Sequence, residues 1–180
     1  PCYDPHASDY KGITSEPQKL LCQSCHSDFE ERMLASSSRH QPVTDGQCSS
    51  CHNPHQSKLG NLLLADGPDL CLACHTDLKT KLAEEKSHSP VERDCQRCHQ
   101  PHAASIDKLL TLPLQPLCGE CHEADAESFQ RAHLSIAAAD MNCMSCHDPH
   151  ASKDPKYFKP TMHAPFAARS CEACHIVENQ

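Results

Sequence analysis

The chain has 180 residues and a formal net charge of −8 at pH 7, which opposes the basic footprint that nucleic-acid binding requires. It contains no Trp, four Phe and three Tyr, too few large side chains for a conventional core of this length. No apolar run approaches the length of a membrane-spanning helix. The chain begins at Pro1 and shows no signal peptide, which indicates a processed or trimmed product.

Cysteine and histidine each occur 15 times, and 14 of the cysteines fall into seven copies of Cys-x-x-Cys-His. Composition alone predicts roughly 0.1 copies. Two intervening residues suit two thioether bonds to the vinyl groups of a c-type haem, and the histidine then ligates the iron. The predicted attachment residues are Cys22, Cys25, Cys48, Cys51, Cys71, Cys74, Cys95, Cys98, Cys118, Cys121, Cys143, Cys146, Cys171 and Cys174. The predicted proximal ligands are His26, His52, His75, His99, His122, His147 and His175.

The motifs alternate between two types, and each type recurs at a period of about 48 residues, which is typical of an internal repeat. Type A motifs follow a leucine and begin at Cys22, Cys71 and Cys118. Type B motifs continue into x-Pro-His and begin at Cys48, Cys95 and Cys143. We interpret the motif at Cys171 as a type B copy that has lost its type A partner. We therefore predict one domain over residues 1–180, with repeat units at about 6–52, 55–99, 102–147 and a shortened 150–175.

Eight histidines remain after the seven proximal ones, one more than seven distal positions need. The candidate distal ligands are His6, His40, His55, His88, His102, His133, His150 and His163. The four methionines do not follow the repeat, so histidine on both sides of each iron is the favoured hypothesis. Such iron is low-spin and has no open position for a substrate.

Spacing suggests which haem each distal histidine serves. The x-Pro-His histidines His6, His55 and His102 each lie at the same distance before a type A cysteine, and we assign them to the type A haems. His40, His88, His133 and His163 each lie shortly before a type B motif, and we assign them to the haems of those motifs. His150 is then spare or ligates a haem outside the chain.

The first residues resemble the end of a type B motif. The segment from Cys2 to Ser8 parallels that from Cys146 to Ser152, with Tyr3 in place of the ligand histidine. Because the histidine is missing, we count no eighth site. We interpret Cys2 as a vestigial or free thiol.

The predicted fold is mostly irregular with short α-helices, because seven porphyrins in 180 residues would form the interior themselves. Short helices are expected over Ser27–Ser36, Thr76–Lys86 and Glu123–Ala138, with Ser27 or Asp28 and Thr76 or Asp77 as N-caps. No segment shows the alternation of a β-strand.

The motifs Cys-x-x-Cys-His-x-Pro-His and His-x-Pro-Val resemble those of multihaem c-type cytochromes with the doubled motif. The resemblance implies an elongated, non-enzymatic electron carrier with haem c as cofactor and other redox proteins as partners. It also implies a location in the periplasm or at the cell exterior, as in periplasmic carriers, porin–cytochrome conduits of the outer membrane and extracellular cytochrome filaments.

Several alternatives are open at this point. A filament protomer would use His6 or His150 to ligate a haem of a neighbouring copy. A multihaem redox enzyme would need an iron with a vacant position, which a high-spin signal would reveal. A zinc protein could use the same residue types, but it needs neither seven adjacent histidines nor a reserve of further ones. Disulfides alone would leave the histidines without a role.

Overall fold

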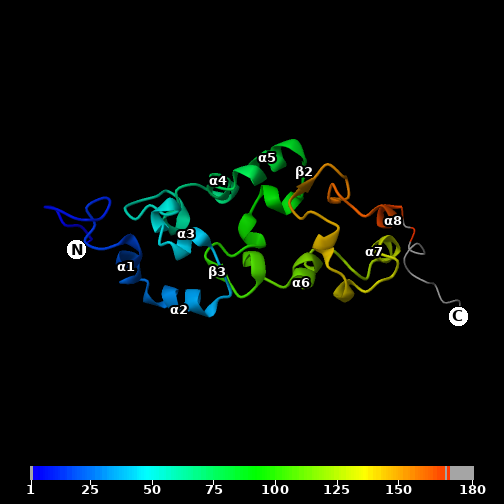
Figure 1. Cartoon of the computed structure of the whole chain (residues 1–180), viewed down its shortest axis with the longest axis horizontal. Coiled ribbons are helices and arrows are strands. Elements are labelled where there is room, and N and C mark those ends of the chain that lie inside the picture. The colour runs from blue at the N-terminus through cyan, green and yellow to red at the C-terminus, as the bar shows by residue number, and fades with distance from the viewer. Residues whose placement is uncertain (1, 169, 171–180) are drawn as a thin grey trace.

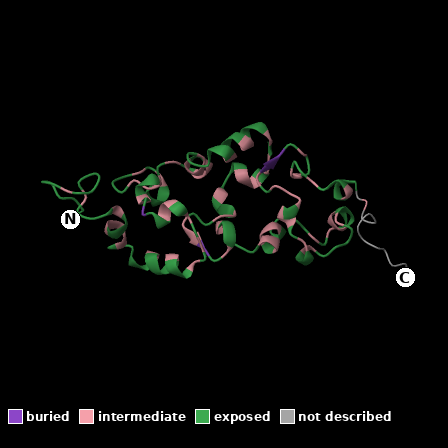
Figure 2. Cartoon of the chain, in the orientation of Figure 1, coloured by how far each residue is buried: buried purple, intermediate pink, exposed green. Residues whose placement is uncertain are grey.

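A computed structural model of the chain describes residues 2–168 and 170. The chain runs along the long axis of an elongated molecule (Figure 1). Its accessible surface is 13470 Å², whereas a compact protein of 19.9 kDa exposes roughly 8,700 Å². Of the described residues, only Gly46, Ala104, Ala151 and Ser152 are buried, and none of them has a large side chain (Figure 2). The polypeptide therefore has no core of its own, and the predicted fold of short helices and irregular segments is confirmed.

The type A motifs lie on short α-helices whose first turns contain or follow a proline. These helices are α1 (Gln18–Gln23), α4 (Gly67–Leu72) and α6 (Leu114–Gly119). A second helix begins directly after the type A proximal histidine in the first two units, α2 (Ser27–Ala35) and α5 (Thr76–Glu84). Both helices were predicted, but their N-caps are His26 and His75, so the predicted caps at the next residues are wrong.

The third predicted helix is shorter than expected. Helix α7 covers only Glu127–Ala132, because the chain leaves helical geometry at His133 and enters the left-handed region at Leu134 and Ser135. The segment that follows contains the 3₁₀ turn η6 (Ala138–Asp140).

The type B motifs have a different local structure. They lie on the 3₁₀ turns η1 (Cys48–Ser50), η4 (Cys95–Arg97) and η7 (Cys143–Ser145). The His-x-Pro element starts a turn of helix with proline in its first positions, in α3 (Gln41–Thr44), η3 (Ser89–Glu92) and α8 (Ala164–Ala167). Proline suits these positions because its fixed φ matches the helix and its missing N–H has no partner there. After the first two type B motifs the chain turns through η2 (Gly60–Leu62) and η5 (Asp107–Leu109).

Within the described residues, two antiparallel pairs of two-residue strands each join one unit to the unit after next. Strand β1 (Ser38–Arg39) pairs with β3 (Ala103–Ala104), and β2 (Lys86–Ser87) pairs with β4 (Ala151–Ser152). The sequence did not predict these strands, since two residues are too few to show alternation. They bring together segments that lie far apart in the chain, and the candidate ligands lie at their ends.

Candidate functional site

Five pairs of histidine rings face one another in the described part of the chain. The ring centroids are 6.0 Å apart in His52–His102, 6.1 Å in His99–His150, 6.2 Å in His40–His75 and 6.0 Å in His88–His122. In these four pairs the ring planes lie within 11° to 23° of parallel. The fifth pair, His133–His147, has centroids 6.3 Å apart and planes 57° apart.

This separation suits one metal ion between two imidazoles. A histidine nitrogen binds a metal ion at about 2.0–2.1 Å, and the ring centre lies roughly 1 Å behind that nitrogen, so two opposed rings have centroids about 6.2 Å apart. Each pair contains one proximal histidine of a Cys-x-x-Cys-His motif and one of the eight further histidines, so the residues present fit a haem iron.

The proximal histidines of the type B motifs are oriented by their own loops. Nδ1 of His52 donates a hydrogen bond to the carbonyl of Asn61 at 2.7 Å, and His99 and His147 donate in the same way to Lys108 and Lys156. The partner lies at the same position after the histidine each time. A ring that donates through Nδ1 keeps the lone pair of Nε2 for a metal, as haem ligation requires.

The distal histidines of the first two units are oriented by the strand pairs. Nδ1 of His40 donates to the carbonyl of Pro101 at 3.0 Å, and Nδ1 of His88 donates to the carbonyl of Pro149 at 3.1 Å. Burial lowers the pKa of His102, and the neighbouring His52 lowers it further. The neutral ring, which is the form that binds iron, is thereby favoured.

The pairing predicted from spacing is wrong for most sites. The structure places His40 opposite His75 and His88 opposite His122, so the His-x-Pro histidines face type A ligands. It places His102 opposite His52 and His150 opposite His99, so these x-Pro-His histidines face the proximal histidine of the type B motif before the one they follow. Only His133, which faces His147, lies as predicted.

The strand pairs explain why these histidines face motifs other than the nearest ones. The backbone N–H of His40 donates to the carbonyl of His102 at 2.9 Å, so two distal ligands lie side by side and their rings enter different sites. His88 and His150 are related in the same way at 2.8 Å. Spacing along the chain favours the nearest motif, whereas these strands select a motif that lies farther away in the sequence.

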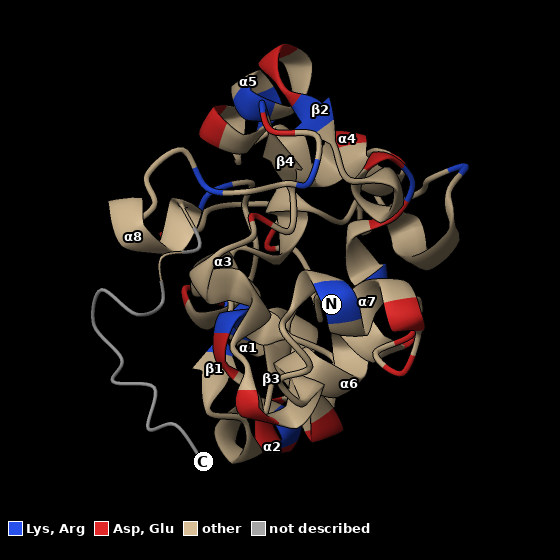
Figure 3. Ribbon diagram, turned by 90° about the vertical axis from the view of Figure 1, so that its right-hand side faces the viewer, with Lys and Arg blue, Asp and Glu red and all other residues tan. Residues whose placement is uncertain are grey.

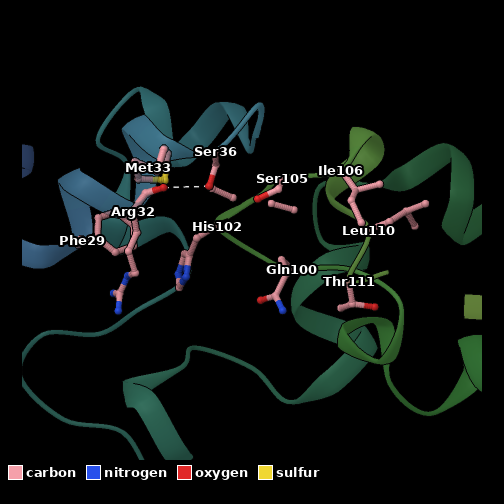
Figure 4. Close-up of a pocket in the computed structure, with 13 residues that line it drawn as sticks. Phe29, Arg32, Met33, Ser36, Gln100, His102, Ser105, Ile106, Leu110 and Thr111 are labelled. Atoms are coloured by element: carbon pink, nitrogen blue, oxygen red, sulfur yellow. Dashed lines mark hydrogen bonds between the residues drawn. The ribbon is translucent and has the colours of Figure 1, made fainter. Parts of the chain in front are cut away.

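Cavities lie beside these rings. A cavity of about 630 Å³ is lined by His102, Phe29 and Arg32, and Figure 4 shows the His102 ring and the Arg32 side chain projecting to the same side of it. A second cavity of about 450 Å³ is lined by the His88–His122 pair, by Cys121, and by the charged residues Arg93, Arg97 and Asp94. A space with two imidazoles, an attachment cysteine and more cations than anions suits a porphyrin with carboxylate side chains.

The cysteines of successive motifs approach one another. The first cysteine of each type A motif contacts the first cysteine of the next type B motif, in the pairs Cys22–Cys48, Cys71–Cys95 and Cys118–Cys143. Burial, followed by the neighbouring thiol, raises the pKa of Cys22, Cys71 and Cys118 to about 11. The second cysteines Cys51 and Cys98 interact with Cys74 and Cys121. The six described motifs therefore form a line in chain order.

The N-terminal loop differs from the type B motifs in having Tyr3 at the position of the proximal histidine. The ring of Tyr3 stacks on His55 with centroids 5.9 Å apart, and the two side chains are joined by a hydrogen bond between the tyrosine hydroxyl and Nε2. His55, predicted to face His75, therefore lies opposite Tyr3. Because the phenol is longer than an imidazole, its oxygen occupies the space that a metal ion would need.

Some predicted residues are not brought together. His6, His26 and His163 face no other histidine ring within the described residues, and the His6 side chain is 94% exposed. The seventh motif, with Cys171, Cys174 and His175, lies outside the described residues. The thirteen described cysteines, including the exposed Cys2, form no disulfide. Among residues 2–168 and 170, no three Cys, His, Asp or Glu side chains gather as a zinc site requires.

Sequence reasoning missed the residues that surround the ligands. Phe29 contacts His102 edge-on at 5.2 Å, and Phe158 stacks on His147 at 4.8 Å. Lys81 forms an ion pair with Asp148, the residue after His147. Burial raises the pKa of Asp148, but the hydrogen bonds from Lys81 and the backbone of His150 and Ala151 outweigh it and lower the pKa overall. No spacing in the sequence signalled these contacts, since Phe29 lies 73 residues before His102 and Phe158 lies 11 residues after His147.

Charged side chains occupy the outer helices and loops. Helices α2 and α5 each carry acidic and basic residues (Figure 3). On α2, Arg32 pairs with Asp28 at 3.1 Å, and both side chains are largely exposed. None of the helices in the described part of the chain has the length and apolar character needed to cross a membrane.

Six described pairs of attachment cysteines lie in line, and in five of these motifs the histidine faces a second imidazole, which defines a multihaem c-type cytochrome. The model of the family described as "Doubled CXXCH motif" matches residues 1–31, 40–80, 88–127 and 133–162, and the chain belongs to this family. None of the curated proteins compared with the chain matches it. Family membership implies c-type haems, electron transfer and a location outside the cytoplasmic membrane.

Proposed function

We propose that the protein carries seven c-type haems, each with histidine on both sides of the iron, and passes electrons along them. When bound, the haems supply a reversible one-electron iron couple. The observation that supports this most is the set of five imidazole pairs with centroids 6.0 to 6.3 Å apart. Both axial positions of these sites are filled by side chains, which favours electron transfer over catalysis at the iron.

Contacts between the cysteines and between the strands place consecutive haem sites next to one another. The cysteine contacts make consecutive motifs neighbours, from the motif at Cys22 to that at Cys143. The strand pairs add a second link, because the Nδ1–H of His40 donates to the carbonyl of Pro101, and the adjacent residue His102 belongs to the neighbouring site of His52. His88, Pro149 and His150 repeat this link in the following unit. A chain of ligands joined in this way supports transfer along the long axis of the molecule.

A reductive titration of the purified holoprotein tests the proposal. We expect the haem absorption to respond reversibly to about seven electrons per chain, one for each motif. The oxidised protein should show low-spin iron only and should not turn over small oxidised nitrogen compounds. A high-spin signal that binds such a substrate and accompanies turnover would contradict the proposal and favour the enzyme alternative.

The compartment and partners follow from the same proposal. Haem attachment outside the cytoplasmic membrane puts the protein in the periplasm or at the cell surface, where other redox proteins would deliver and accept electrons near a terminal haem. Surface labelling of intact cells with a membrane-impermeant reagent distinguishes the two locations. Labelling before cell disruption indicates the surface, and labelling only after permeabilisation of the outer membrane indicates the periplasm.

A further inference from the structure

The His133–His147 site differs from the other four in the angle between its rings. Its planes are 57° apart, whereas the other pairs lie between 11° and 23°. The centroid distance of 6.3 Å is close to those of the other sites. The site therefore has the same span but a different ring orientation, and the difference has a cause in the contacts of the two rings.

The His147 ring is fixed by its own loop. It donates through Nδ1 to Lys156 at 2.8 Å, and Phe158 stacks on it at 4.8 Å with planes 19° apart. Phe158 forms an isolated β-bridge with His147, and the residues in the same position of the two preceding type B loops are Leu63 and Leu110. An aromatic face beneath the ligand is thus particular to this loop.

The His133 ring is fixed by helix α7 rather than by a strand pair. It donates through Nδ1 to the carbonyl of Phe129 at 3.0 Å, four residues earlier, and stacks on the Phe129 ring at 4.1 Å. The corresponding His40 and His88 instead donate to a proline carbonyl 61 residues later in the chain. Since His133 takes its orientation from its own helix, its ring need not align with that of His147.

We propose that Phe129 and Phe158 are positioning residues that hold the two axial imidazoles of this site crossed, so that its haem is electronically distinct from those of the four described parallel pairs. The inference rests on the proposed function. Parallel imidazoles interact with the same iron d orbital and separate it from its neighbour in energy. Crossed imidazoles interact with one orbital each, so the two stay close in energy and the low-spin iron becomes more anisotropic magnetically.

Electron paramagnetic resonance of the fully oxidised holoprotein tests the proposal. We expect a strongly anisotropic low-spin signal at lower field than those of the parallel pairs. Phe158→Leu, which introduces the residue of the preceding loops, and Phe129→Leu should each shift this signal towards the others or remove it. Phe158→Tyr, which keeps the aromatic face, should retain it. Phe29→Leu is the matched control, because Phe29 contacts His102 in a nearly parallel pair.

The outcomes separate this inference from the proposed function. Wild-type, Phe158→Leu and Phe129→Leu spectra that superimpose, with full haem content in each, would overturn the positioning role while leaving the electron carrier intact. The same holds if Phe158→Tyr alters the signal as much as Phe158→Leu does. A holoprotein without low-spin iron would instead overturn the proposed function. Haem content per chain, measured on each variant, identifies any that has failed to fold.

Discussion

The N-terminal loop and the loop after His52 have the same backbone but different chemistry. Tyr3 bridges to Thr14 as His52 bridges to Leu63, and in both loops the chain passes through two residues with positive φ before the bridge. In the first loop, however, the Tyr3 hydroxyl is hydrogen-bonded to His55. In the second loop, the ring centroid of His52 lies 6.0 Å from that of His102. The loop conformation is therefore set by its turn residues, and one side chain decides whether a metal ion fits.

The largest expected effect comes from removing the histidine that faces each loop, which is His102 for the loop after His52 and His55 for the N-terminal loop. His102→Ala should leave one iron with a single imidazole, so that about one iron per chain becomes high-spin and binds carbon monoxide when reduced. His55→Ala should leave the spin state of the irons unchanged, because His55 faces Tyr3. Ferric absorption and carbon monoxide difference spectra measure both. A high-spin signal in His55→Ala equal to that in His102→Ala would contradict the observed pairing.

A substitution at Tyr3 tests whether the ligand alone separates the loops. Tyr3→His places an imidazole opposite His55, as His52 lies opposite His102. We expect the variant to bind added ferric protoporphyrin at least about tenfold more tightly than the wild type, a difference of about 1.4 kcal/mol, with a low-spin spectrum. Equal affinity for the two proteins would show that the first loop lacks more than a ligand.

A third comparison concerns the residue after the ligand position, which is Asn53 in the loop after His52 and Asp148 in the loop after His147. Asp148→Asn keeps an acceptor for the turn and removes the ion pair with Lys81, whose side chain is 32% exposed. We expect a loss of about 1 kcal/mol in the free energy of unfolding at neutral pH. The pKa of Asp148 is lower in the folded protein than in the unfolded chain, where it is about 3.9. The ion pair therefore adds its full stabilisation above the unfolded pKa, and this stabilisation is lost as the pH falls through the folded pKa.

Chemical denaturation of the wild type and of Asp148→Asn at several pH values checks this sign. The difference between the two proteins should be constant above about pH 5 and shrink below about pH 4. Arg32→Gln is the control, because its ion pair with Asp28 is largely exposed and should contribute little at any pH. A difference that grows on acidification would refute the role of the ion pair.

The smallest effect is expected for Tyr3→Phe. The variant keeps the ring that stacks on His55 and removes the hydroxyl that bonds to it. Because both residues are exposed, the free energy of unfolding should fall by about 0.5 kcal/mol or less. Haem content and spin state should not change, and any change in either would place Tyr3 at an iron.

The sequence predicted the features that depend on local chemistry. The attachment residues and the helices after His26 and His75 follow from short motifs, and the family and the helices confirm the type of fold. The partners of His40, His88, His102 and His150 could not be predicted, because they depend on strands of two residues such as β1 and β3, which leave no periodic pattern. The crossed rings of His133 and His147 depend on side-chain contacts that spacing does not encode.

Intact-mass spectrometry of the purified holoprotein tests the central claim most directly. The account predicts the 19.9 kDa polypeptide plus seven covalently bound haems, one at each motif from Cys22 to Cys171. A mass equal to that of the bare polypeptide, in protein purified from a host that attaches haem to other c-type cytochromes, would contradict it.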